Sequence, residues 1–80
     1  SCNYGPSARV IDNIISKKLV LKYKSDSISD YKLYNLISKG KVRFNKSEIR
    51  NEPCAIYYVE SGDLSLLIEN CEDQALVEFK

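Results

Sequence analysis

The clearest pattern of hydrophobic and polar positions lies in residues 54–71, where apolar side chains recur at every second position on both sides of a Gly-Asp pair. This period of two is typical of β-strands with one buried face. If Gly62 and Asp63 form a two-residue loop, glycine at the first position suits a type II′ turn, because that turn requires a positive φ there. The segment therefore predicts an antiparallel hairpin in which Ser61 pairs with Leu64.

This register sorts the hairpin side chains onto two faces. One face is predicted to point into the core and carries Ala55, Tyr57, Val59, Leu64, Leu66 and Ile68. The other face combines polar with apolar side chains and carries Glu60, Ser65, Glu69, Ile56, Tyr58 and Leu67. The second face is therefore expected to be only partly covered by the rest of the domain.

The same count places Cys54 opposite Cys71 at a non-hydrogen-bonded site, where Cα atoms lie about 4.5 Å apart, at the short end of the disulfide range. We therefore predict a Cys54–Cys71 disulfide, which would stabilise the fold by about 3 kcal/mol. A disulfide implies an oxidising compartment such as the periplasm or the cell surface. The alternative is a pair of buried free thiols in a cytosolic protein.

The third cysteine, Cys2, follows the small residue Ser1 at the start of the sequence. This arrangement resembles the lipidated first cysteine of a bacterial lipoprotein, and it would imply a lipid anchor as the protein's only link to a membrane. Two alternatives remain open, a chance tail residue and a partner for Cys54 or Cys71. No apolar stretch approaches the roughly 20 residues that span a bilayer.

Two helices are predicted in the first half of the chain. The first begins at about Pro6, a residue that suits a first helical turn. Its apolar residues repeat at three- and four-residue spacing and are Val10, Ile11, Ile14 and Ile15. The second is capped by Ser27 or Ser29 and ends at Gly40, which is expected in the left-handed conformation. Its apolar stripe is Leu33, Leu36 and Ile37, with Tyr31 and Tyr34 alongside. Between the helices, residues 19–24 alternate like a strand, although they could instead extend the first helix.

Short strands are predicted on both sides of the hairpin. Residues 41–45 alternate with Val42 and Phe44 inward, and the final strand places Ala75, Val77 and Phe79 on one face. The sequence thus predicts a single α+β domain over residues 6–80, preceded by a tail over residues 1–5. Its architecture is expected to be two N-terminal helices packed on an antiparallel meander of three to four strands.

The chain is small, and its charged residues are unevenly distributed. The 80 residues are 44% hydrophobic and 29% charged, and folding at this size buries roughly 60% of the unfolded surface, so a covalent staple or a partner adds needed stability. Residues 1–50 hold eleven lysines and arginines against four carboxylates, whereas residues 51–80 hold seven carboxylates against one lysine. This division indicates either a charged binding face or two halves that neutralise each other.

Catalytic signatures are missing from the sequence. There is no histidine, so catalysis and zinc binding through imidazole are excluded. Ser61-Gly62 lacks the residues of a nucleophile elbow, and no glycine-rich phosphate loop is present. We expect a protein that is not an enzyme and that holds no metal or cofactor.

The remaining classes are binding functions. Small domains with tyrosine on a sheet face and divided charge suit recognition of another protein, so the leading hypothesis is an extracytoplasmic protein-binding module, such as an inhibitor or immunity protein that neutralises a toxin or enzyme. The expected contact residues are Ile56, Tyr58, Leu67 and Glu69, with the lysines Lys22, Lys24 and Lys32 as second choice. The alternatives are a nucleic-acid-binding domain using the basic, tyrosine-containing first half, which the lysine bias disfavours, and a structural accessory lipoprotein of an envelope complex.

Overall fold

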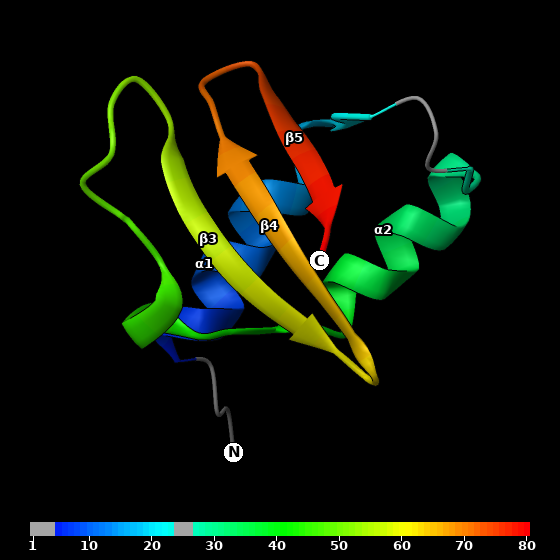
Figure 1. Ribbon diagram of the computed structural model, residues 1–80, viewed down its shortest axis with the longest axis horizontal. Coiled ribbons are helices and arrows are strands. Elements are labelled where there is room, and N and C mark those ends of the chain that lie inside the picture. Colours follow the sequence, from blue (N-terminus) through cyan, green and yellow to red (C-terminus); the bar gives the residue numbers. More distant parts are fainter. Residues whose placement is uncertain (1–4, 24–26) are drawn as a thin grey trace.

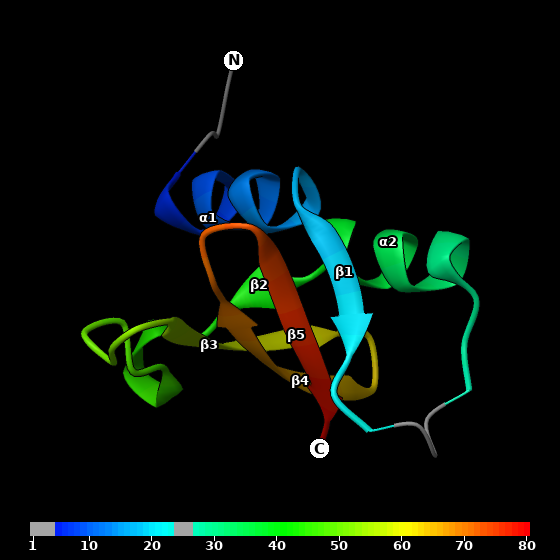
Figure 2. The same cartoon turned by 90° about the horizontal axis from the view of Figure 1, so that it is seen from above.

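A computed structural model describes residues 5–23 and 27–80. Along these residues the elements are α1 Pro6–Ile15, β1 Lys18–Leu21, α2 Asp30–Ser38, β2 Lys41–Val42, the 3₁₀ helix η1 Phe44–Lys46, β3 Ala55–Ser61, β4 Leu64–Asn70 and β5 Gln74–Phe79. The strands form one sheet in the order β1-β5-β4-β3-β2, and α1 and α2 lie on the same side of it (Figures 1 and 2). The fold is therefore α+β, as predicted.

The sheet differs from the predicted meander in strand number and direction. It has five strands and is mixed, because β1 pairs with β5 in parallel while the other neighbours are antiparallel. The prediction missed the parallel pairing because β1 and β5 are distant parts of the chain, and local periodicity carries no signal for their contact.

Residues 18–21 form a strand, which decides between the two interpretations of this segment. Lys18 aligns with Gln74 and Leu21 with Val77. Leu19 and Leu21 pack against the core from the edge of the sheet. The alternation of these two leucines therefore reflects a strand with one face on the helices, although the strand is shorter than the predicted 19–24.

The hairpin register is confirmed at every predicted pair, from Ser61 opposite Leu64 to Ala55 opposite Asn70. Gly62 has a φ of +61° and no other described residue has a positive φ, which is the combination that a type II′ turn requires. The Cys54–Cys71 disulfide is present, with Cα atoms 4.6 Å apart. A local turn thus fixes both the strand pairing and the cysteine pairing.

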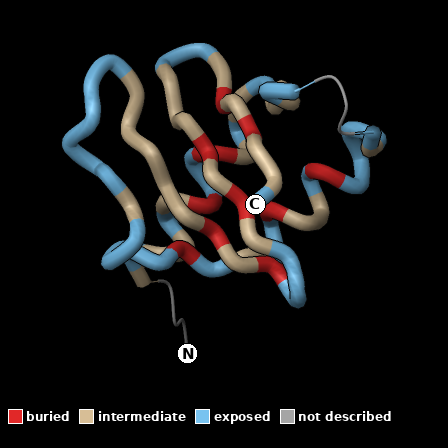
Figure 3. Tube along the Cα trace, viewed as in Figure 1, coloured by how far each residue is buried: buried red, intermediate tan, exposed pale blue. Residues whose placement is uncertain are grey.

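The core lies between the helices and the sheet (Figure 3). α1 contributes Ile11 and Ile14, and α2 contributes Leu33 and Ile37. The strands contribute buried residues of alternating positions, which are Val42, Val59, Leu66, Ile68, Ala75 and Val77. The predicted apolar stripes of both helices therefore face the sheet.

The two ends of α2 show different outcomes. Its N-terminus is capped by Ser29, whose side chain accepts a hydrogen bond from the Lys32 N–H at 3.3 Å, so one of the two predicted caps is confirmed. The prediction for Gly40 is wrong, because its φ is not positive. A Cβ at this position would lie 2.5 Å from Val59 Cγ1. Glycine is required here because the chain passes closely over β3.

The predicted strand over residues 41–45 is mostly absent. Only Lys41 and Val42 pair with β3, after which the chain turns into η1. Val42 is buried as predicted, but Phe44 is 41% exposed and does not point inward. The reason is that the 3₁₀ turn breaks the period of two, so Phe44 no longer shares a face with Val42.

Candidate protein-contact face

The face of the sheet opposite the helices carries no helix among the described residues, and we call it the helix-free face. Strand alternation and register place on it the apolar side chains Val20, Ile56, Tyr58, Leu67 and Leu76 and the charged side chains Lys22, Glu60, Glu69 and Glu78. The apolar side chains come from four neighbouring strands. They therefore form the centre of the face rather than scattered single positions.

Cross-strand pairs organise this face into two rows. Ile56 lies opposite Glu69, and Glu69 lies opposite Leu76 on β5. Tyr58 lies opposite Leu67. All five residues are partly exposed, since their neighbours cover their stems while the outer surfaces remain open to solvent. An aromatic ring beside aliphatic side chains and carboxylates gives a flat, amphipathic surface.

Ion pairs border the apolar centre. Lys22 Nζ lies 2.7 Å from Glu69 Oε2 and 3.8 Å from Glu78 Oε1. The hydrogen bond and charge of Glu69 raise the pKa of Lys22 above its ordinary value of 10.5. At the other side of the sheet, Arg43 Nε lies 2.6 Å from Glu60 Oε1. These contacts each join a cation of the basic first half to a carboxylate of the acidic second half, so part of the charge division is neutralised within the fold.

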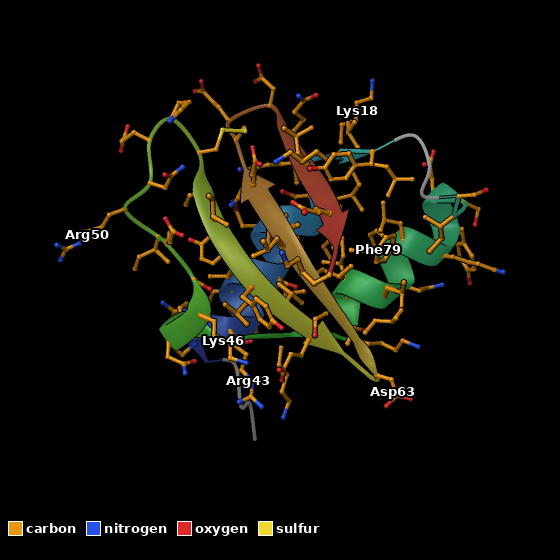
Figure 4. All side chains as sticks on the ribbon, viewed as in Figure 1. Lys18, Arg43, Lys46, Arg50, Asp63 and Phe79 are labelled. Atoms are coloured by element: carbon orange, nitrogen blue, oxygen red, sulfur yellow. A yellow bond between two sulfur atoms is a disulfide. The ribbon has the colours of Figure 1, made fainter. Side chains whose placement is uncertain are left out.

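The segment after β2 closes the border of the face next to Tyr58. Lys46 Nζ lies 4.9 Å from the centre of the Tyr58 ring, within cation–π range. The Tyr58 N–H donates to Ser47 Oγ at 2.9 Å, and Glu48 forms a β-bridge with Ile56. Ser47 thus binds the backbone of Tyr58, and Lys46 contacts its ring. Figure 4 shows Arg43 and Lys46 on the same border of the molecule.

The structure brings together four of the residues predicted as a contact surface, Ile56, Tyr58, Leu67 and Glu69, on the helix-free face. Lys22 joins them through Glu69. Lys32 lies on α2, in the layer on the other side of the sheet. Lys24 and Cys2 lie outside the described residues. Lys22 and Lys32, the two second-choice lysines that the structure describes, therefore do not form one patch.

Sequence reasoning missed three contributors to this face. Val20 and Leu76 extend its apolar centre to the far strands, and Lys46 covers the Tyr58 ring. The alternation of residues 18–22 and 74–79 contains the signal for the first two, but their common face depends on the parallel β1–β5 pairing. The position of Lys46 depends on the 3₁₀ turn and had no signal in the pattern.

Among the described residues, no group of three histidine, cysteine, aspartate or glutamate side chains is placed to hold a metal ion. No described helix is long and apolar enough to cross a membrane. A surface groove of about 910 Å³ lies between α2 with the residues before it, the first residue of β4 and the last residue of β5. That last residue is Phe79, which Figure 4 labels.

The fold and this face define the class as a small disulfide-bonded α+β domain with one sheet face covered by helices and one without them. No family model, curated protein sequence or solved structure matches the chain.

Proposed function

We propose that this protein is a binding module for another protein, and that the helix-free face is its contact surface. The observation that carries the proposal is the apolar centre formed by Tyr58, Leu67 and their neighbours, bordered by ion pairs. Protein interfaces combine an apolar, tyrosine-containing centre with a polar rim in the same way. The partner that fits is a folded protein with an apolar patch, such as a toxin or an enzyme that the domain neutralises.

The stiffness of the face supports this proposal. The Cys54–Cys71 disulfide closes the open end of the β3–β4 hairpin, and strand alternation places both sulfur atoms on the same side of the sheet as Ile56 and Glu69. A surface that is already ordered loses little conformational entropy on binding. The disulfide also supports a location outside the cytosol, in the periplasm or at the cell surface, because such bonds persist in oxidising compartments.

Affinity measurements with variants of β3 and β4 test the proposal. The protein is isolated with its bound partner from its own cells, and the recovered complex gives the partner for titration. Leu67→Ala and Tyr58→Ala should each weaken the complex at least tenfold, since central interface residues contribute 2 kcal/mol or more each, on the order of a hot spot. Leu64→Ala is the matched control, because it removes the same side chain from the same strand on the opposite face.

Two results would contradict the proposal. One is unchanged partner affinity in both variants while their circular dichroism matches the parent protein. The other is recovery of RNA or DNA in place of a protein, with binding lost as salt concentration rises, because that salt dependence marks phosphate contacts.

A further inference from the structure

The outer edge of β1 offers backbone hydrogen-bonding groups to a partner. β1 is the terminal strand of the sheet and pairs with β5 alone among the described strands. The Lys22 N–H donates to the Val77 carbonyl at 2.8 Å. The backbone N–H and C=O groups of Val20, two residues earlier, therefore also point toward β5. By alternation, the N–H and C=O groups of Leu19 and Leu21 point away from the sheet.

The opposite edge differs: its strand β2 has two residues, the Val42 N–H there donates to Ser7 Oγ at 2.9 Å, and the chain after β2 covers the rest of β3. On β3, the Tyr58 N–H donates to Ser47 Oγ and the Tyr58 carbonyl accepts from the Arg43 N–H. Ile56 exchanges two backbone hydrogen bonds with Glu48, at 2.7 and 3.0 Å. The chain therefore covers one edge of its sheet with its own backbone and leaves the edge at β1 for addition of a strand.

Figure 2 shows α2 beside β1, and residues of both elements line a groove. It is lined by Ile15, Lys17, Lys18, Leu19, Asp30, Tyr31 and Tyr34 and has a volume of about 420 Å³. Tyr31 is 76% exposed and Tyr34 is 45% exposed. Free edge groups beside a pocket for alternate side chains are the two features that peptide recognition by strand addition requires.

We propose that β1 binds an extended peptide segment of a partner protein, whose side chains alternate between acidic and apolar. On a strand added to β1, every second side chain would enter the groove against Leu19 and Tyr34. The intervening side chains would lie beside Lys18, which is exposed and projects away from the molecule (Figure 4). No described carboxylate lies within ion-pair distance of Lys18, so a carboxylate on the partner complements it. This edge adjoins the helix-free face at Val20 but does not include Tyr58 or Leu67.

A second copy of the chain fits this edge less well. Two copies can pair their β1 strands about a two-fold axis, so that the outward backbone groups of Leu19 in each copy bond those of Leu21 in the other. This pairing places Lys18 of each copy directly opposite Lys22 of the other. Like charges directly opposite each other destabilise strand pairing, and edge lysines commonly prevent self-association of sheets. An acidic strand removes this repulsion, which is why we assign the edge to a partner of opposite charge.

A blocked hexapeptide of alternating glutamate and valine is the probe for this proposal. Its titration into ¹⁵N-labelled protein should shift the amide signals of Leu19 and Leu21 and the ring signals of Tyr34, and it should slow hydrogen exchange at both leucine amides. Two further hexapeptides carry N-methyl groups on alternate residues in one phase or the other. The peptide whose methyl groups replace the amide hydrogens that face β1 should not bind, whereas the peptide methylated at the other amides should still bind. The reason is that only every second amide of an added strand faces β1.

Charge variants complete the test. Lys18→Glu should weaken the glutamate–valine peptide about threefold and strengthen a lysine–valine peptide, as a cross-strand ion pair requires. Lys41→Glu is the control, since it makes the same change in an exposed lysine on β2 at the opposite edge, and it should leave the affinity unchanged. Unshifted Leu19 and Leu21 amides, equal binding of both N-methylated peptides, or a dimer that protects these amides without peptide would overturn the proposal. None of these results bears on Tyr58→Ala or Leu67→Ala, so failure here and failure of the helix-free face are distinguishable.

Discussion

The two faces of the β3–β4 hairpin contain similar residues but differ in how far the rest of the domain buries them. Leu66 is completely buried beneath the helices, whereas its neighbour Leu67 is partly exposed on the helix-free face. On the paired strand, Val59 is likewise completely buried, whereas its neighbour Tyr58 is partly exposed. Hydrophobicity alone therefore does not define the core of this domain. The position of α1 and α2 decides which of the two apolar faces is buried in the core and which stays partly exposed.

The largest expected difference between the faces is in the free energy of unfolding. Leu66→Ala should lower it by about 3 kcal/mol, because the change removes buried methylene groups and leaves a cavity. Leu67→Ala should lower it by about 1 kcal/mol or less, because its side chain is already partly in water. Urea denaturation of both variants measures this contrast. Equal losses would show that something covers the helix-free face as completely as the helices cover the other.

The disulfide is the second expected effect, and it stabilises the helix-free side without packing. Replacing Cys54 and Cys71 together by alanine should lower the free energy of unfolding by about 3 kcal/mol or slightly less, because the unfolded chain regains the entropy of an open loop. Both proteins carry Cys2→Ser, so that no third thiol can react. Unfolding of the parent with and without reductant should give the same difference. A loss well under 1 kcal/mol would contradict the stabilising role of this bond.

A smaller effect is expected where α2 leads into β2 over the core face. Gly40→Ala should cost about 2 kcal/mol, because the new Cβ would lie 2.5 Å from Val59 Cγ1 and overpacked sites cost about 1–3 kcal/mol. Gly5→Ala is the control, since no atom lies within 4 Å of a Cβ added there. Thermal unfolding of the two variants measures the difference. A neutral Gly40→Ala together with a destabilised Gly5→Ala would contradict the close approach of these segments.

The smallest expected effect concerns the ion pair on the helix-free face. The raised pKa of Lys22 means that its charged form is favoured by folding, through the hydrogen bond and charge of Glu69. This contribution is fully present below pH 10.5, the ordinary lysine value, and is lost as the pH rises through the higher folded-state pKa. NMR titration of the Lys22 side chain should show a lower pKa in Glu69→Gln, whereas Glu72→Gln, at an exposed position after β4, should leave it unchanged. An unchanged Lys22 pKa in Glu69→Gln would contradict the pairing.

The sequence predicted the hairpin and its chemistry best. Gly62-Asp63, the alternation on both sides and the two cysteines each indicated the same register, which the structure confirms. These signals agree because a two-residue turn fixes every pair that follows it. The four hairpin residues of the candidate site were predicted together for the same reason. The helix starts were also predicted, since Pro6 and Ser29 act through neighbouring backbone groups.

The errors occurred where a contact joins distant segments. Gly40 was expected in a left-handed conformation, but its small size is needed for the approach to Val59, 19 residues later. Phe44 followed the alternation of Val42 until a 3₁₀ turn changed its direction. Val20 and Leu76 joined the candidate face only through the parallel β1–β5 pairing. Periodicity describes which side of an element a residue occupies, not which element lies beside it.

By itself, then, the sequence determined the hairpin, its turn, its disulfide and the apolar sides of both helices, because each depends on backbone geometry within a few residues or on one fixed register. Only the tertiary structure decided that β1 joins the far edge beside β5, and that the backbone after β2 covers the opposite edge. These arrangements depend on how separate elements bury their apolar sides together. They also decide which face of the sheet no α-helix covers and which edge pairs with a single neighbouring strand among the described residues.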